Sequence, residues 1–275
     1  MSDSRPHVAY VSYNGLTEPL GASQVLPYVR ELSSTYRFTL VSFEKAHGPV
    51  AREAADIDAE LGRHGNLWIR LRYHRAAGLL SKAWDLAMGA RALRRLAQRD
   101  PYRLIHARGY VPAAIAVRAG GGREVPYLFD IRGLQAEESV DAGTWRPGGL
   151  RFRLTKRSER TLLARASGIV TLTNAVRPHL RAQPGLRGRD PPWQVIPCCV
   201  DLDHFRFDAP ARARVRESLG LAASDLLLVY SGSIGTWYST ETAIRAARDH
   251  AGAFLLFLTF TPQDVIDAPC ATEGL

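Results

Sequence analysis

The sequence is poor in cysteine, with three among 275 residues. Two of them, Cys198 and Cys199, are adjacent, and the third is Cys270. An odd count without disulfide-type spacing argues against a disulfide scaffold and predicts a reducing, cytoplasmic setting. A zinc site needs about four ligands, and no second group of Cys or His stands at a suitable spacing. We therefore expect no metal.

Long apolar runs are also missing. The most apolar late segment, residues 253–260, is far shorter than the roughly 20 residues that a bilayer span needs, so we expect a buried strand there. Residues 1–7 lack the basic and apolar regions of a signal peptide, which argues against export. Hydrophobic residues at 46% and charged residues at 23% are near the average of soluble proteins, which indicates a globular chain.

Negative charge is in the minority. Lys and Arg number 36 against 27 Asp and Glu, so the net charge is +9, and arginine is concentrated between residues 146 and 165. An anionic membrane, a phosphorylated substrate or nucleic acid would each suit such a patch. A plainer alternative is an arginine-rich composition that raises the charge everywhere. Nucleic acid is supported by charge alone, and we do not expect it as a partner.

Strand-like and helix-like patterns alternate along the chain, which is typical of a doubly wound α/β fold. Residues 7–13 form a continuous apolar run, as in a strand buried on both faces. We expect a glycine loop over residues 14–21 and then a helix over residues 22–32. The pattern continues with strands at 38–43, 67–71, 104–107, 127–130, 168–173 and 193–197, and with helices at 50–64, 78–99, 111–119 and 152–166.

A second domain is expected to begin at residue 226, after a first domain over 1–207 and a linker over 208–225 that contains a short helix. An apolar strand there breaks into Gly232-Ser-Ile-Gly235 before a helix at 239–250. Backbone N–H groups in such a loop can approach an anion at the positive end of the helix, and a sugar-nucleotide diphosphate would fit. With only one further strand, at 253–260, and no periodicity after residue 260, we expect an incomplete domain with exposed apolar surface.

Polar side chains stand at the ends of two predicted strands. His106 and Arg108 end one strand, and Asp130 and Arg132 end the next. Because ligands collect outside the carboxyl ends of parallel strands, we expect these four side chains to face one crevice. Arg108 could bind a phosphate through two hydrogen bonds. Asp130 could pair with Arg132 to hold the loop, or could accept a hydrogen bond from a substrate hydroxyl.

Several short motifs occur in a specific order, although each alone is a weak signal. They are Gly21-Ala-Ser-Gln-Val-Leu, Leu104-Ile-His-Ala-Arg108, Phe129-Asp-Ile-Arg-Gly133, Arg157-Ser-Glu-Arg160, Val195-Ile-Pro-Cys-Cys-Val-Asp201 and Tyr230-Ser-Gly-Ser-Ile-Gly235. With these motifs the chain resembles the GT-B glycosyltransferases, and within them the large retaining family usually called family 4.

The resemblance implies a Rossmann-like N-terminal domain that binds the acceptor, and a second Rossmann-like domain that binds a nucleotide-sugar donor. The implied reaction transfers the sugar to a saccharide or lipid-linked acceptor with retention, and it needs no cofactor because amides and cations can stabilise the departing diphosphate. Catalytic roles are implied for His106 and Arg108. The other implied site residues are Gly232, Ser233, Gly235 and Thr236 for the donor, and Gly21, Ser23, Asp130 and Arg132 for the acceptor-side cleft.

The sequence also departs from the family pattern. Many members have His-x-His where this chain has His106 and Arg108, and many have Arg and Lys where it has Thr236 to Tyr238. The family's Glu-x7-Glu segment would lie beyond residue 275, so we expect a chain truncated at its C-terminus. A sugar-nucleotide epimerase of the same architecture and a non-catalytic binding remnant stay open as alternatives, and a peripheral membrane contact through the basic surface is a further option.

Overall fold

The computed structural model describes residues 3–45, 50–74, 79–235 and 238–273. Its contacts divide the chain into two compact units, residues 1–140 with 145–199 and residues 200–275 with 141–144. The division after Cys199 comes earlier than the predicted domain end at residue 207. Within the predicted linker lies the helix α9 (Ala209–Ser218).

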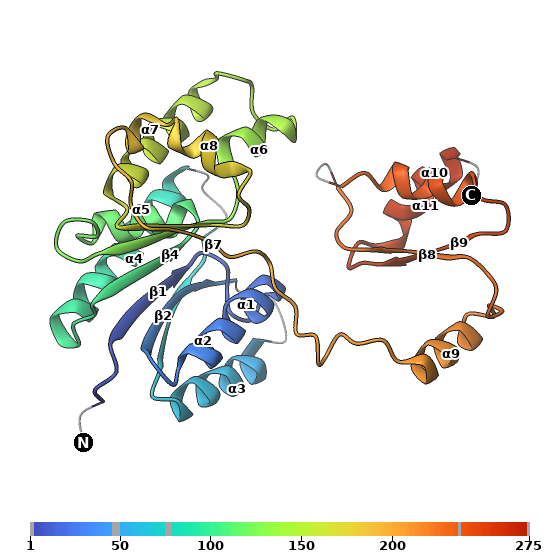
Figure 1. Cartoon of the computed structure of the whole chain (residues 1–275), viewed down its shortest axis with the longest axis horizontal. Coiled ribbons are helices and arrows are strands. Elements are labelled where there is room, and N and C mark those ends of the chain that lie inside the picture. Colours follow the sequence, from blue (N-terminus) through green and yellow to red (C-terminus); the bar gives the residue numbers. More distant parts are fainter. Residues whose placement is uncertain (1–2, 46–49, 75–78, 236–237, 274–275) are drawn as a thin grey trace. The chain divides into compact units, whose positions relative to one another are not determined.

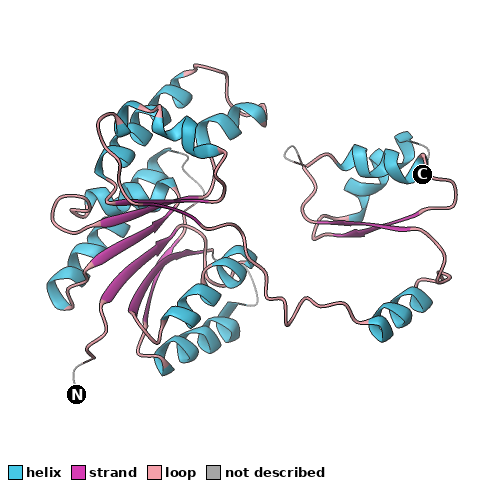
Figure 2. Ribbon diagram, viewed as in Figure 1, coloured by secondary structure: helices cyan, strands magenta, loops and turns pink. Residues whose placement is uncertain are grey.

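The first unit is built on a parallel sheet of seven strands in the order β3-β2-β1-β4-β5-β6-β7 (Figures 1 and 2). The chain runs outward from β1 to β3 and then returns to β4 beside β1, so the topological switch point lies between β1 and β4. This confirms the predicted doubly wound fold. The strands are β1 (His7–Ser12), β2 (Arg37–Glu44), β3 (Leu67–Arg72), β4 (Leu104–Arg108), β5 (Tyr127–Ile131), β6 (Gly168–Thr171) and β7 (Trp193–Val195).

Helices cover both faces of this sheet (Figure 1). One face packs against α1 (Pro19–Gln24), α2 (Leu26–Leu32) and α3 (Val50–Arg63), and the other against α4 (Leu79–Arg99), α5 (Tyr110–Arg118) and α7 (Leu150–Arg165). The remaining helices of the unit, which the sequence patterns did not predict, are α6 (Gln135–Asp141), α8 (Val176–Arg181) and the 3₁₀ turn Pro184–Leu186.

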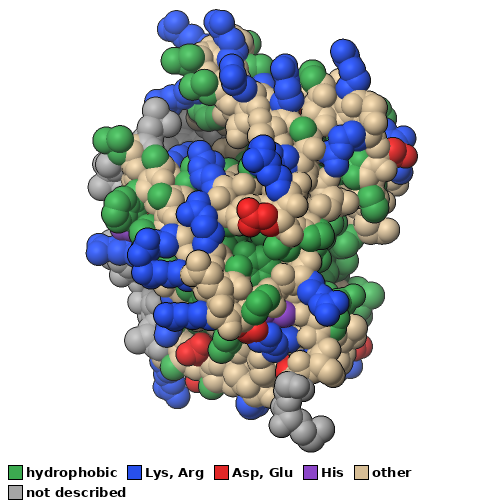
Figure 3. All heavy atoms as spheres, turned by 90° about the vertical axis from the view of Figure 1, so that its left-hand side faces the viewer, with side chains coloured by type: hydrophobic (Ala, Val, Ile, Leu, Met, Phe, Trp, Pro, Cys, Tyr) green, Lys and Arg blue, Asp and Glu red, His purple; other side chains and the backbone are tan. Residues whose placement is uncertain are grey.

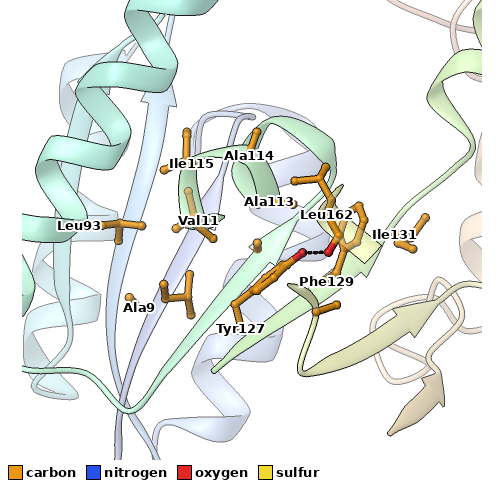
Figure 4. Packing of buried hydrophobic residues seen from close by; sticks show 14 of the residues in the cluster. Ala9, Val11, Leu93, Ala113, Ala114, Ile115, Tyr127, Phe129, Ile131 and Leu162 are labelled. Carbon is orange, nitrogen blue, oxygen red and sulfur yellow. Dashed lines mark hydrogen bonds between the residues drawn. The ribbon is translucent and has the colours of Figure 1, made fainter. Parts of the chain in front are cut away.

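The core follows from the alternation of side chains along each strand. In β1, Ala9 and Val11 face the cluster under α4, α5 and α7, whereas Val8 and Tyr10 face the cluster under α2 and α3. Both sets are buried, as the continuous apolar run predicted. In the larger cluster the Tyr127 hydroxyl donates a hydrogen bond to the backbone carbonyl of Leu162, which ties β5 to α7 (Figure 4).

Two predictions for the segment after β1 are wrong. The loop ends at Glu18 rather than at residue 21, because Pro19 starts α1 and a proline suits the first turn of a helix. The helix predicted over 22–32 is two helices that meet at Val25. Pro27 has no backbone N–H to continue the hydrogen bonding of α1.

The second unit contains β8 (Leu227–Ser231), α10 (Thr240–Arg248) and β9 (Phe254–Leu258), with the two strands parallel. Although the sequence after residue 260 shows no periodicity, α11 (Gln263–Glu273) occupies most of it and buries Ile266. Pro269 within that segment hides the helical pattern in the sequence. As expected, apolar side chains of the small sheet stay exposed, and Phe260 after β9 is 98% exposed.

Candidate functional site

The residues predicted at the ends of β4 and β5 come together beside the switch point. The Nε2 atom of His106 lies 3.4 Å from Oδ2 of Asp130, and Nη1 of Arg132 lies 3.6 Å from Oδ1 of the same carboxylate. The ring of Tyr10 on β1 stacks at a tilt on His106, with 4.3 Å between ring centroids. Three adjacent parallel strands thus bring these groups together. The prediction included His106, Asp130 and Arg132 but not Tyr10, and the fourth predicted residue, Arg108, is not among the residues that line the pocket beside them.

Asp130 is charged although it is nearly buried, with 6% of its side chain exposed. Burial alone would raise its pKa. The hydrogen bond with His106 and the positive charges of His106, Arg132 and Arg108 outweigh burial and hold the pKa of Asp130 below its ordinary value. Its Oδ1 atom, however, is buried without a hydrogen-bond partner among the described residues. Oδ1 is thus ion-paired with Arg132 at 3.6 Å but accepts no hydrogen bond there, so a water molecule or a ligand hydroxyl could donate one to it.

Arg108 and Arg132 converge on a residue to which the sequence patterns assigned no role. Both guanidinium groups donate to Oε1 of Gln24, Arg108 through a short bond and Arg132 over 3.1 Å. Arg108 is 8% exposed, and burial lowers its pKa. Gln24 follows Gly21 by three residues on α1, so helical spacing places both on one side of the helix. That spacing is the signal that could have identified Gln24.

An apolar pocket opens beside these polar groups. Its volume, counted with its open mouth, is about 520 Å³. Side chains of β1, β2 and α2 form much of its wall, and His106, Asp130, Arg132 and Gln24 form its polar part. The remaining lining residues are Tyr10, Tyr28, Val29, Leu32, Phe38, Val170 and Ile196. A ligand here would meet an apolar wall and a charged end.

The two predicted cleft residues on α1 have different surroundings. Gly21 is buried, and a Cβ atom at this position would lie 2.0 Å from the backbone oxygen of Gly15. It therefore serves the close packing of α1 on the preceding loop. Ser23 is exposed, and its hydroxyl donates to the carbonyl of Pro19 over 2.6 Å within the helix. Neither is among the residues that line the pocket.

The predicted donor loop follows β8 in the second unit. Gly232 has φ of 145°, a conformation that side chains with Cβ rarely adopt, so glycine is needed there. The Gly232 amide donates to the Leu258 carbonyl over 3.1 Å, and the Ile234 amide donates to Oγ1 of Thr261 over 3.4 Å. The amide of Ser233 meets no acceptor among the described residues, whereas Gly235 pairs with Tyr238 in an antiparallel bridge. Thr236 lies outside the residues that the structure describes.

The doubly wound sheet with a pocket at its switch point, followed by a strand, glycine loop and helix, defines an α/β protein of the GT-B type. A family model of the glycosyl transferase 4-like domain matches residues 21–199. The chain therefore belongs to this family of glycosyltransferases.

Solved structures of low sequence identity share the fold. Sucrose-phosphate synthase from Thermosynechococcus elongatus is 16% identical with a TM-score of 0.70, and the similarity covers 98% of this chain and 68% of that one. A glycosyltransferase from Rickettsia africae ESF-5 is 13% identical with a TM-score of 0.65, and the similarity covers 99% of this chain and 66% of that one. Anabaena HepE, solved with UDP and glucose, is 14% identical with a TM-score of 0.63, covering 97% and 66%.

This chain thus spans about two thirds of the length of those proteins. A search of curated proteins finds no match. Within the described residues, no helix has both the length and the apolar character needed to cross a bilayer.

Proposed function

We propose that the chain transfers a sugar from a nucleotide-sugar donor to a hydroxyl group of an acceptor, with retention at the anomeric carbon. The pocket at the switch point of the first unit binds the acceptor, and the loop after β8 binds the donor diphosphate. The observation that carries this proposal is the Oδ1 atom of Asp130, which is buried at the polar part of an apolar pocket and, although ion-paired with Arg132, accepts no hydrogen bond among the described residues. Retention rests on the family resemblance.

An acceptor hydroxyl is the donor that Asp130 lacks. Leaving a buried acceptor atom unpaired costs about 1–3 kcal/mol, so a ligand that donates a hydrogen bond to Oδ1 recovers this free energy on binding. A hydroxyl held there would have its oxygen lone pairs free to attack an anomeric carbon. His106 and Arg132 keep the carboxylate ionised and fixed in direction. Arg108 acts through Gln24 as a positioning residue.

The donor assignment rests on the loop after β8. The amide of Ser233 is a neutral donor for a phosphate oxygen, and the positive end of α10 follows a few residues later. Anabaena HepE was solved with UDP and glucose, which favours a uridine diphosphate sugar as the first donor to test. The acceptor is a saccharide or a lipid-linked molecule, and the apolar pocket wall favours one with an apolar portion near its hydroxyl.

The test measures consumption of UDP-sugars by the full chain with and without a panel of hydroxyl acceptors. Release of UDP only in the presence of an acceptor, with a glycosylated product, supports the proposal. Asp130→Asn should lower the rate about 10²-fold, because the variant lacks the charged acceptor that holds and orients the hydroxyl. The matched control is Asp190→Asn, an exposed carboxylate paired with Arg181, and it should leave the rate unchanged.

Two outcomes would overturn the assignment. Conversion of the UDP-sugar to an isomer without acceptor would identify an epimerase. Failure of calorimetry to detect binding of any nucleotide sugar to the full chain would favour a non-catalytic binding protein.

A further inference from the structure

The helical layer formed by α4, α5 and α7 presents positive charge without exposed negative charge. Its only two acidic residues are Asp85 and Glu159, and both are fully buried. Asp85 accepts a hydrogen bond from the Tyr13 hydroxyl over 2.8 Å, and Glu159 accepts one from the Tyr110 hydroxyl. Both carboxylates are thereby removed from the surface.

The exposed charge of this layer is arginine-rich. Arg91, Arg94 and Arg95 of α4 and Arg153, Arg157 and Arg160 of α7 are all exposed. Among the described residues, the ion pairs on these helices belong to Asp85 and Lys156, so the six arginines have no carboxylate partner. Figure 3 shows one side of the molecule, on which Lys and Arg side chains are widely spread with few Asp and Glu among them.

Exposed apolar side chains accompany these arginines at one end of the layer. Leu80 and Trp84 on α4 are 77% and 58% exposed, and Leu150 and Leu154 on α7 are 73% and 56% exposed. Their i, i+4 spacing puts each pair on one side of its helix. Because α4 and α7 each lead into a strand of the same parallel sheet, both helices begin at the carboxyl edge of that sheet. The two apolar pairs therefore belong to the same edge of the domain.

A groove brings one of the apolar side chains, Leu154, beside cationic groups. It runs between α5 and α7, and Leu154, Arg118 and Arg157 are among the residues that line it. A phosphate group could bind the two guanidinium groups there while a hydrocarbon chain contacts the leucine.

We propose that the outer face of α4, α5 and α7 docks on the surface of an anionic phospholipid bilayer. The arginines bind lipid phosphates, and Leu80, Trp84, Leu150 and Leu154 enter the interfacial region, where tryptophan is favoured. The phosphates of a nucleic acid would also bind the arginines, but this partner would leave the four apolar side chains in water. The inference goes beyond sugar transfer and does not depend on it, because docking requires neither donor nor acceptor.

The test is co-sedimentation of the full chain with vesicles of phosphatidylcholine alone, or of phosphatidylcholine and phosphatidylglycerol in equal parts. Binding is expected for the anionic vesicles only and should weaken as salt is added. Each cation near an anionic surface strengthens binding about fivefold, so Arg153→Ala with Arg157→Ala should weaken it about 25-fold. The control, Arg52→Ala with Arg63→Ala, alters two exposed arginines of α3 on the opposite face of the sheet and should bind like the wild type.

The apolar side chains are tested separately by Trp84→Ser and Leu154→Ser, with Leu20→Ser, a half-exposed leucine of α1, as control. Weaker vesicle binding by the first two variants alone supports insertion. Equal binding by all variants, or equal binding to neutral and anionic vesicles, would overturn the proposal. So would duplex DNA binding that exceeds vesicle binding and is unaffected by Trp84→Ser and Leu154→Ser, since it would identify a nucleic-acid surface.

Discussion

Replacing Gly21 by alanine tests how the pocket is built. The added Cβ atom would lie 2.0 Å from the Gly15 oxygen and 2.7 Å from the Leu16 Cα atom, and both are backbone atoms that no side-chain rotation can move. Normal contacts at Cβ begin near 3.4 Å, so α1 or the loop must shift by more than 1 Å. Overpacking of this kind costs about 1–3 kcal/mol. The better helix propensity of alanine recovers about 1 kcal/mol.

We therefore expect Gly21→Ala to lower the stability of the first unit by up to about 2 kcal/mol, or up to about 8 °C in thermal midpoint for a unit of this size. The assay is thermal unfolding followed by circular dichroism. Gly62→Ala is the matched control, since this helical glycine of α3 has nothing within 4 Å of its added Cβ. Gly62→Ala should raise the free energy of unfolding by about 0.5–1 kcal/mol. If Gly21→Ala is as stable as Gly62→Ala, α1 does not pack on the loop as described.

Two further predictions concern the same unit. Gln24→Ala removes the side-chain oxygen to which both Arg108 and Arg132 donate hydrogen bonds. The affinity for the sugar acceptor should therefore fall, and the free energy of unfolding should drop by about 1–3 kcal/mol. Wild-type values of both the affinity, measured by calorimetry, and the unfolding free energy would contradict this prediction. Burial lowers the pKa of His7 below its ordinary 6.5, so its neutral form is favoured in the folded state. Its stabilising effect is complete above pH 6.5 and is lost as the pH falls below that value toward the lowered pKa. His7→Gln should flatten the pH dependence of the thermal midpoint between about pH 7 and pH 5. If the thermal midpoint of this variant varies with pH as strongly as that of the wild type, His7 is not the group responsible.

Local patterns predicted the parallel sheet because its strands are short continuous apolar runs, such as residues 7–13. The same reasoning predicted the meeting of His106 and Asp130, since parallel strands end at one edge. Short or proline-containing helices were missed, including α6, α8 and α11, because a few turns carry too little periodicity. The role of Gln24 was missed although Gln24 follows Gly21 by one helical turn, because its contacts with Arg108 and Arg132 join segments far apart in the sequence.

The central claim is that an acceptor hydroxyl binds Asp130 and takes a sugar from a nucleotide donor. The most direct measurement is the rate of UDP release from a UDP-sugar by the wild type and by Asp130→Asn, each with and without acceptor. The account predicts release that depends on acceptor and falls about 10²-fold in Asp130→Asn. Release that is independent of acceptor, or equal in the two proteins, would contradict it.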